Sequence, residues 1–358
     1  MKILFITRKF PPSVGGMELF AHDISQELSK SNDLALVKWG GSRKWYPVIL
    51  PYLSLWSFYE LLKGDINIIH IQDSLFSPLG LILSRLFAKP YVVVSHGLDL
   101  TWDNYLYQKV IPYCVKRANA IFCISQEVCD IATESGVAPE KIHSIPLGIK
   151  DDIYGQYSRE EGREILEVKS SSKIILSVGR LVERKGVRIF IRDVLPLLIK
   201  KHKDLLFIII GEGEERKNIE KEIIKQNLSG HVRLMGQVED YVRIAAYNAS
   251  DVFVMPNIVV KNDIEGFGLV VLEASLCKLP VVASSIGGIR DAITNNSNGI
   301  LIEPGQIDEF YKTVDGFLSG PAEAQRFGEQ SRKFTLENYS WDKVAKKYME
   351  VYKQLIKN

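Results

Sequence analysis

The sequence has little net charge and no long uninterrupted apolar segment, and each absence excludes a class of protein. Its 358 residues include 45 Lys and Arg against 43 Asp and Glu, a formal net charge of +2. So small a net charge produces no strong positive electrostatic potential of the kind that binds nucleic acid. The most apolar long window, residues 48–62, is broken by Pro51 and Glu60 and is shorter than the roughly 20 residues that span a bilayer. With 46% hydrophobic residues, the composition is that of a soluble globular protein.

Cysteine is scarce, and motifs that hold metal ions are missing. No D-x-D sequence occurs, and the five histidines other than His96 show no metal-ligand spacing, so we predict no metal site. We also predict no bound cofactor. The cysteines form no C-x-x-C pair, and we expect reduced, buried thiols and a cytoplasmic location. The four are Cys114, Cys123, Cys129 and Cys277.

Short β-branched runs alternate with amphipathic segments such as Met17–Ser29 and Leu79–Phe87 along the whole chain. Continuous apolar strands between helices are typical of a parallel sheet covered on both faces. A polar stretch, Lys150–Glu164, separates two such series. We therefore predict an α/β protein with two doubly wound domains, 1–155 and 156–340. The predicted strands are 2–7, 34–39, 66–72, 91–95 and 120–125 in the first domain and 173–178, 205–210, 232–235, 251–255, 280–284 and 299–302 in the second.

Ligand-binding residues are expected in the loops after these strands, because open α/β sheets bind ligands at the carboxyl ends of their strands. After the first strand, Gly15 and Gly16 precede a helix. Paired glycines allow a close backbone approach, and a helix N-terminus attracts an anion. His96 directly follows the strand 91–95. A ligand-free turn and a structural histidine are the simpler explanations, and at this level both stay open.

The second half carries charged residues in the same kind of position. Arg180 and Lys185 follow the strand 173–178, where a guanidinium fork and an ammonium group could bind phosphate oxygens. Glu265 and Glu273 have E-x7-E spacing around the start of a helix, whose free amides could bind sugar hydroxyls or a phosphate. The alternatives are a solvated basic turn and a surface helix with solvated carboxylates.

Two further glycine loops follow later strands. Gly287 and Gly288 repeat the pattern of strand, paired glycines and helix. The segment Gly211–Arg216 is similar to the start of a dinucleotide-binding fingerprint, but it has arginine where the third glycine belongs. Its three glutamates would also repel a pyrophosphate, so we do not expect a nicotinamide cofactor.

Together these loops resemble the GT-B retaining glycosyltransferases of family four, which include the phosphatidylinositol mannosyltransferases. The resemblance implies two Rossmann-like domains that face each other across a cleft, with the last helix, 341–358, returning to the first domain. It also implies transfer of a hexose from a nucleotide-diphosphate sugar, GDP-mannose or a UDP-sugar, without a metal ion. It covers nearly the whole chain and rests on Phe10-Pro11-Pro12…Gly15-Gly16, Ser95-His96-Gly97, Pro146-Leu147-Gly148-Ile149, Gly179-Arg180-Leu181…Arg184-Lys185-Gly186, Met255-Pro256, Glu265–Glu273 and Gly287-Gly288.

The resemblance also implies roles for single residues. Arg180 and Lys185 would neutralise the donor's diphosphate in place of a metal ion. Glu265 would bind hydroxyls of the transferred sugar, and His96 would lie near the sugar's 6-hydroxyl or the reacting centre. These four residues form the predicted catalytic set. Glu273 would take the ribose hydroxyls of the nucleotide. The predicted donor-binding residues are Gly15, Gly16, Gly179, Val238, Phe267, Gly268, Leu269, Val270 and Glu273.

An aromatic and basic stretch in the first domain, residues 38–59, bears on the acceptor. Trp and Tyr favour membrane–water interfaces, and interleaved cations suit anionic headgroups. Members of the family often reach lipid-linked acceptors with this region. We therefore expect a glycan or lipid-linked acceptor in cell-envelope synthesis and peripheral contact with an anionic membrane. An ordinary helix that covers the sheet is the alternative explanation.

Two other functions are compatible with the same architecture. A UDP-N-acetylglucosamine 2-epimerase also joins two Rossmann-like domains, but it does not need the E-x7-E spacing together with the R…K-G segment. A non-catalytic sugar-nucleotide or glycan-binding protein has no need for Arg180, Lys185 and both glutamates at once. A transfer assay distinguishes these functions from a glycosyltransferase.

Overall fold

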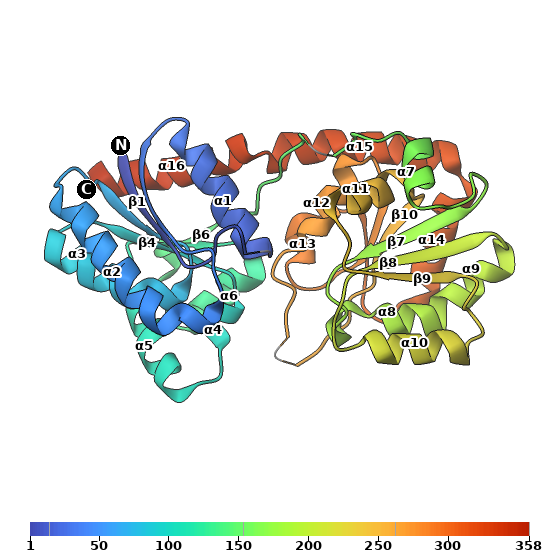
Figure 1. Ribbon diagram of the computed structural model, residues 1–358, viewed down its shortest axis with the longest axis horizontal. Coiled ribbons are helices and arrows are strands. Elements are labelled where there is room, and N and C mark those ends of the chain that lie inside the picture. The colour runs from blue at the N-terminus through green and yellow to red at the C-terminus, as the bar shows by residue number, and fades with distance from the viewer. Residues whose placement is uncertain (14, 153, 262, 358) are drawn as a thin grey trace. The chain divides into compact units, whose positions relative to one another are not determined.

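The computed structural model describes residues 1–358 except Val14, Ile153, Asn262 and Asn358, so Val14 of the first glycine loop lies outside the described residues. The chain forms two compact units, which Figure 1 shows. One consists of Met1–Gly148 and Tyr339–Asn358, and the other of Ile149–Asn338. The polar stretch that the sequence places between the domains thus belongs to the second unit.

The first unit contains a six-stranded sheet in the order β2-β1-β3-β4-β5-β6, and every neighbouring pair is parallel. Its strands are β1 (Lys2–Thr7), β2 (Asp33–Lys38), β3 (Ile68–Ile71), β4 (Tyr91–Ser95), β5 (Ala120–Cys123) and β6 (Ile142–Ser144). Its α-helices are α1 (Gly16–Ser29), α2 (Tyr46–Leu62), α3 (Ser77–Phe87), α4 (Leu98–Thr101), α5 (Tyr105–Val115), α6 (Gln126–Glu134) and α16 (Trp341–Lys357).

One strand of this sheet, β6, is missing from the sequence prediction. It has three residues, lies at the edge of the sheet and leaves its side chains partly exposed, so it lacks the continuous apolar run by which a buried strand is recognised. The other strands follow the expected apolar runs.

The C-terminal helix α16 is anchored on this sheet by two tyrosines that are fully buried, Tyr348 and Tyr352. The Tyr348 ring lies 4.4 Å from the ring of Phe122 on β5. The hydroxyl of Tyr352 lies 2.6 Å from Nδ1 of His70 on β3, whose Nε2 lies 2.6 Å from Oε1 of Gln72. A neutral imidazole satisfies both contacts, since Nε2–H donates to Gln72 and the tyrosine donates to Nδ1.

We expect this histidine to make the first unit sensitive to acid. Burial lowers the pKa of His70 from 6.5 to about 4, although its hydrogen bond to Gln72 opposes the shift. Above pH 6.5 the folded and unfolded chains both carry neutral His70, and its contribution to stability is complete. As the pH falls from 6.5 towards 4 only the unfolded chain takes up the proton, so stability falls by about 3 kcal/mol. Urea denaturation at several pH values measures this slope.

The matched variants are His70→Asn and His231→Asn. The first removes the buried imidazole and should flatten the slope between pH 6.5 and 4, even if it lowers stability at neutral pH. The second changes a histidine of the other unit and should leave the slope of the first unit unchanged. An unaltered slope in His70→Asn would refute the assignment.

The second unit contains another six-stranded parallel sheet, in the order β12-β11-β10-β7-β8-β9. Its strands are β7 (Lys173–Val178), β8 (Leu205–Ile210), β9 (Val232–Gly236), β10 (Val252–Met255), β11 (Val281–Ser284) and β12 (Ile300–Ile302). Its α-helices are α7 (Arg159–Ile165), α8 (Val187–Ile189), α9 (Leu195–Lys201), α10 (Arg216–Lys225), α11 (Asp240–Ala249), α12 (Leu269–Leu276), α13 (Ile289–Ala292), α14 (Ile307–Ser319) and α15 (Pro321–Tyr339). The predicted fold class, two doubly wound parallel sheets, is confirmed.

Candidate active site

Lys185 and Glu265 form a buried ion pair at the carboxyl end of the second sheet. Lys185 follows β7 and Glu265 follows β10, and these strands are neighbours. The Nζ atom of Lys185 lies 2.6 Å from Oε2 of Glu265, and each side chain is only 12% exposed. Parallel strands end at one edge of the sheet, which explains why residues so far apart in sequence meet here.

The same carboxylate oxygen has two more donors, which the sequence analysis missed. Nη1 of Arg184 lies 2.5 Å from Oε2 of Glu265, and the amide of Asn257 donates to it at 3.0 Å. Arg184 also pairs with Asp263 at 2.9 Å. No described residue donates to the other oxygen, Oε1, so one oxygen of Glu265 holds the loops together and the other is free for a ligand.

The charged side chains of this cluster sum to a net positive charge, because Arg180, Arg184 and Lys185 stand against Glu265 and Asp263. Burial alone would raise the pKa of Glu265, but Lys185 and Arg184 outweigh it and hold the pKa below its usual value. Burial lowers the pKa of Lys185, and the charges of Arg184 and Arg180 lower it further, against the opposing effect of Glu265. The exposed Arg180 has no ion-pair partner among the described residues. The cluster therefore attracts an anion.

Glycines let the backbones of these loops approach one another. A Cβ atom on Gly211 would lie 1.9 Å from the carbonyl oxygen of Gly179, and one on Gly288 would lie 2.1 Å from that of Gly266. The amide of Gly288 donates to the carbonyl of Glu265 at 2.9 Å. The paired glycines after β11 thus support the Glu265 loop, and the loop after β8 packs against Gly179.

The remaining predicted donor-binding residues lie at the same edge of the second unit. Phe267 is buried, and Gly268 has φ 86° directly before α12. Helix α12 begins with Leu269 and Val270, which are half-buried. The backbone amides of a first helical turn lack partners within the helix and attract anions. Val238 is half-buried in the segment after β9. The predicted start of this helix at Leu269 is confirmed.

Glu273, which the resemblance assigns to the ribose hydroxyls, is enclosed by protein groups. It is 5% exposed, and protein groups already bind both of its oxygens. Tyr154 donates to Oε1 at 3.0 Å; Tyr247 donates to Oε2 at 2.8 Å, and Arg243 donates to the same oxygen at 2.6 Å. Burial raises the pKa of both tyrosines, and the charge of Glu273 raises it further. Counting residues along α12 places Glu273 correctly on the helix but cannot reveal this enclosure.

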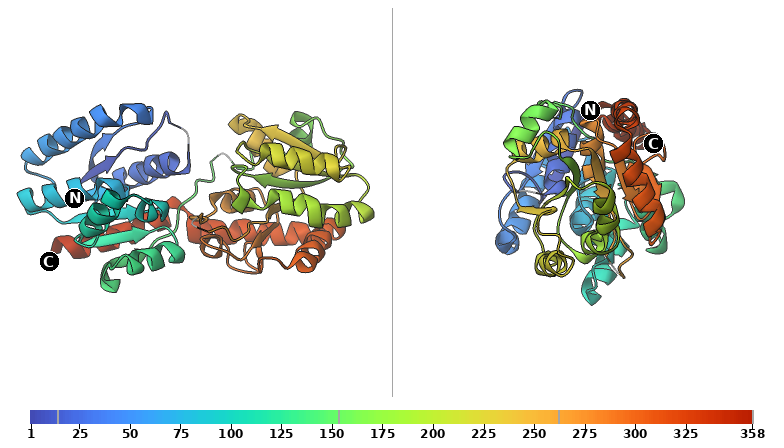
Figure 2. Two further views of the ribbon diagram at one scale, coloured as in Figure 1. Left: turned by 90° about the horizontal axis from the view of Figure 1, so that it is seen from below. Right: turned by 90° about the vertical axis from the view of Figure 1, so that its right-hand side faces the viewer.

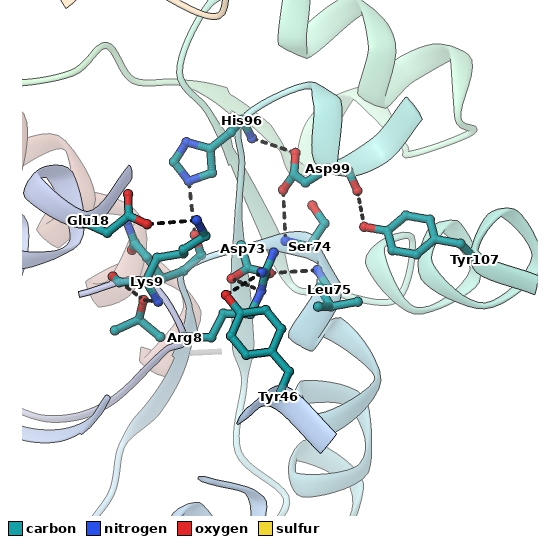
Figure 3. A network of polar contacts seen from close by, with 12 residues as sticks. Arg8, Lys9, Glu18, Tyr46, Asp73, Ser74, Leu75, His96, Asp99 and Tyr107 are labelled. Atoms are coloured by element: carbon teal, nitrogen blue, oxygen red, sulfur yellow. Dashed lines mark hydrogen bonds and ion pairs between the residues drawn. The ribbon is translucent and has the colours of Figure 1, made fainter. Parts of the chain in front are cut away.

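The first unit has its own polar network at the carboxyl ends of its strands, shown in Figure 3. Lys9, after β1, forms a buried ion pair with Glu18 of α1 at 2.8 Å. A Cβ on Gly15 would lie 2.4 Å from Oε2 of Glu18, so this carboxylate packs against the predicted glycine loop. Gly16, the first residue of α1, is exposed.

His96 is held in this network by its backbone and by its ring. Its amide donates to Oδ1 of Asp99 at 2.8 Å, and Ser74 donates to Oδ2 of the same carboxylate at 2.9 Å. Nε2 of His96 lies 3.1 Å from the carbonyl oxygen of Gln72 and therefore carries a proton. The ring also makes an edge contact with Phe20 of α1, with centroids 5.6 Å apart. Asp99 thus ties the ends of β3 and β4 together beneath His96.

A second carboxylate, Asp73, lies beside Asp99 in Figure 3. Arg8 contacts Asp73 at 3.1 Å and donates to the hydroxyl of Tyr46 at 3.1 Å. Burial raises the pKa of Asp73 although the charge of Arg8 opposes the shift. The sequence analysis missed Arg8, Asp73 and Asp99; the signal available was a charged residue just after a predicted strand, the same signal that singled out Arg180.

Within each unit, then, the structure brings several predicted residues to one sheet edge: Lys185, Glu265 and Gly179 in the second, and Gly15 and His96 in the first.

Within the described residues, no group of three or more His, Cys, Asp or Glu side chains is placed to hold a metal ion. None of the helices described combines the length and apolar character needed to cross a bilayer.

Two doubly wound parallel sheets, each in its own unit, are typical of the GT-B class of fold, and solved structures agree. HepE of Anabaena in complex with UDP superimposes with a TM-score of 0.81 at 20% identity, over 99% of this chain and 100% of that one. Sucrose-phosphate synthase of Thermosynechococcus elongatus gives a TM-score of 0.79 at 19% identity, over 100% and 99% of the two chains. These likenesses show the GT-B fold.

Sequence comparisons identify the family. Residues 158–334 match the family described as glycosyl transferases group 1, and residues 14–153 match glycosyltransferase family 4. A glycosyltransferase of Methanocaldococcus jannaschii is 27% identical over 99% of this chain and 98% of its own length. The GDP-mannose-dependent alpha-(1-6)-phosphatidylinositol monomannoside mannosyltransferase of Mycolicibacterium smegmatis is 24% identical over 95% of both. The chain belongs to the GT4 family of glycosyltransferases, which confirms the resemblance inferred from its motifs and disfavours the epimerase.

Proposed function

We propose that this glycosyltransferase moves a hexose from GDP-mannose or a UDP-sugar to a lipid-linked or saccharide acceptor with retention of anomeric configuration and without a metal ion. The observation that carries the proposal is the buried pair of Lys185 and Glu265 beside the exposed Arg180. The cluster has more positive than negative charge, because Arg180, Arg184 and Lys185 stand against the carboxylates of Asp263 and Glu265. The diphosphate of a nucleotide sugar supplies the missing negative charge.

The chemistry follows from where charge develops. As the bond between the anomeric carbon and the phosphate oxygen breaks, negative charge grows on the leaving diphosphate and positive charge on the sugar ring. Fixed cations aimed at the departing oxygens stabilise this state more than the ground state. We assign that role to Lys185 and Arg180. The acceptor oxygen bonds the anomeric carbon from the same face, and its proton passes to the leaving phosphate, so no protein base is required.

The free oxygen of Glu265 is suited to a sugar hydroxyl. Three donors converge on Oε2, whereas Oε1 has none among the described residues and can accept from the transferred sugar. We assign the amides of Leu269 and Val270 to contacts with the sugar or phosphate. On the first unit, we assign His96 to the reacting centre and the glycine loop to backbone contacts with the donor.

The relatives support both a guanine nucleotide and a uracil nucleotide as the donor. A relative in Mycolicibacterium smegmatis is named as GDP-mannose-dependent and acts on a phosphatidylinositol mannoside. HepE has been solved with UDP and with UDP-glucose. Both kinds of donor carry the diphosphate that the cation cluster would bind, and the lipid acceptor of the mannosyltransferase supports a lipid-linked acceptor here.

Thermal unfolding with UDP, GDP and ADP, each beside its uncharged nucleoside, tests the proposal. We expect one diphosphate to stabilise the protein by about 2.7 kcal/mol at 100 times its dissociation constant, and its nucleoside to have little effect. With the nucleotide sugar of that diphosphate as the donor, the protein should release the diphosphate when an acceptor is added. Equal shifts with nucleoside and diphosphate, or no shift with any of the three, would contradict the assigned role of the cations.

A further inference from the structure

Trp341 lies where the chain returns to the first unit. That unit ends its first segment at Gly148 and resumes at Tyr339, two residues before Trp341. The tryptophan is the first residue of α16 and is only 4% exposed. A Cβ atom on Gly148 would lie 2.5 Å from the indole, so a larger residue there would displace the ring. The indole is therefore packed directly on the segment by which the chain leaves the first unit.

A row of aromatic rings leads from Trp341 to His96. Helix α16 packs against α1 in the first unit, and Figures 1 and 2 show these two helices side by side. The Trp341 indole stacks on the ring of Phe20 from α1, with centroids 5.6 Å apart and planes 20° apart. Phe20 also meets the His96 ring edge-on, with the planes at 80°. Aromatic pairs prefer both arrangements. Since Phe20 is only 3% exposed, it cannot shift without moving one of these neighbours.

The contact with Phe20 bears on the direction in which the His96 ring points. The Nε2–H group of His96 donates to the carbonyl of Gln72, and this one hydrogen bond leaves the ring free to tilt about it. The edge contact with Phe20 restricts that tilt. No described residue binds Nδ1 of His96, which keeps the lone pair of the neutral ring and can accept a hydrogen bond from a substrate hydroxyl. The direction of this lone pair therefore depends on where Phe20 lies.

Core packing alone does not explain why residue 341 is a tryptophan. Its Nε1–H group is buried and has no hydrogen-bond partner among the residues that the structure describes. A buried donor without a partner is destabilising, and buried tryptophans usually pair this group. Phenylalanine or leucine would fill the core without that cost. The indole adds a broad flat face against which the ring of Phe20 lies.

We propose that Trp341 is a positioning residue for sugar transfer that acts on His96 through Phe20. The indole fixes the Phe20 ring, and the Phe20 ring fixes the direction in which Nδ1 of His96 meets the substrate. An error in that direction lowers the rate of the chemical step more than it weakens binding. The inference rests on the role proposed for His96 at the reacting centre, and it adds to that site a residue of the last helix.

Steady-state sugar transfer by matched variants tests the inference. Trp341→Leu should lower kcat about tenfold and change KM for the nucleotide sugar less than about twofold. Trp341→Phe keeps an aromatic face toward Phe20 and should retain most of the wild-type kcat. The control is Tyr348→Leu, which also removes a buried aromatic ring from α16, but one that packs on Phe122 instead of Phe20. This control should be less stable than the wild type and should keep the wild-type kcat.

Nuclear magnetic resonance of protein with isotope-labelled histidine gives a readout that does not depend on activity. The ring current of Phe20 acts on the C–H protons of His96, so Trp341→Leu should shift their resonances and Tyr348→Leu should not. The loss of these resonances in His96→Gln assigns them. Resonances that do not move in Trp341→Leu would overturn the inference, as would equal losses of kcat in Trp341→Leu and Tyr348→Leu.

A wild-type kcat in Trp341→Leu would overturn the inference as well, and His96→Gln then locates the error. If His96→Gln also transfers sugar at the wild-type rate, the role proposed for His96 is wrong. If His96→Gln is inactive, that role stands and the coupling through Phe20 is absent. Thermal unfolding with the diphosphate checks the rest of the proposed function, because Trp341→Leu and Tyr348→Leu should both keep the full diphosphate shift.

Discussion

Lys185→Ala should lower the rate of sugar transfer by about 10²- to 10³-fold, the loss typical of removing one group that stabilises charge in a transition state. The side chain is buried against Glu265 and would contact the leaving diphosphate only through its ammonium group. Because its contribution grows as the bond breaks, kcat should fall more than KM rises. Steady-state transfer with the nucleotide sugar identified by thermal unfolding measures both constants.

The control for this variant is Lys261→Ala, which removes an exposed lysine from the loop that leads to Glu265. It should transfer sugar at close to the wild-type rate. Arg180→Ala should also be strongly impaired, because we assign its exposed guanidinium to the same phosphates. Wild-type turnover in either Lys185→Ala or Arg180→Ala, with the protein folded, would show that the cation in question does not act on the leaving group.

Glu273→Ala should destabilise the second unit by about 3 kcal/mol, since it breaks a buried ion pair and leaves Arg243 with the exposed Asp240 in place of a buried partner. The substitution removes the acceptor shared by Arg243, Tyr154 and Tyr247, two of which are almost fully buried. Urea denaturation of the second unit measures the loss. Glu220→Ala is the control, because Glu220 forms an exposed pair with Arg216 that should contribute less than about 1 kcal/mol.

Glu273→Gln separates this structural role from contact with the nucleotide. Glutamine keeps the shape of the side chain and one oxygen acceptor but not the charge, so the loss of stability should be smaller than in Glu273→Ala. If Glu273 also binds the ribose, as the family resemblance implies, the diphosphate shift should fall well below that of the wild type. An undiminished shift would leave Glu273 as a structural residue that positions α11 and α12.

The fold could be predicted from sequence because buried parallel strands are continuous apolar runs. Each strand of the second sheet lies within one residue of its predicted limits, whereas the edge strand β6 has no such run. Charged residues at strand ends, such as Lys185 and Glu265, could be found in the same way, because their position follows from the strand that precedes them. The direct contact between Lys185 and Glu265 arises because β7 and β10 are neighbours in the sheet, and this order of strands cannot be predicted from the sequence.

The sequence could not predict which side chains are covered by other parts of the chain. Its place near the start of α12 predicts that Glu273 faces the ligand, yet Tyr154 and Tyr247, which approach from distant segments, cover it. In helix α2, by contrast, apolar side chains are exposed where burial would be expected. Residues 48–62 form the most apolar long window of the sequence, but only the packing on β1 and β2 shows which of them stay in solvent. Burial depends on partners from elsewhere in the chain, so periodicity along one helix cannot determine it.

The central claim is that side-chain cations, rather than a divalent metal ion, stabilise the leaving diphosphate. The direct measurement is the initial rate of sugar transfer by the wild type and Lys185→Ala, each with a chelator and then with added magnesium or manganese. The account predicts that the wild-type rate is unaffected by the chelator and that neither metal restores the variant. A wild-type rate that collapses with the chelator and returns only on addition of a divalent ion would contradict it.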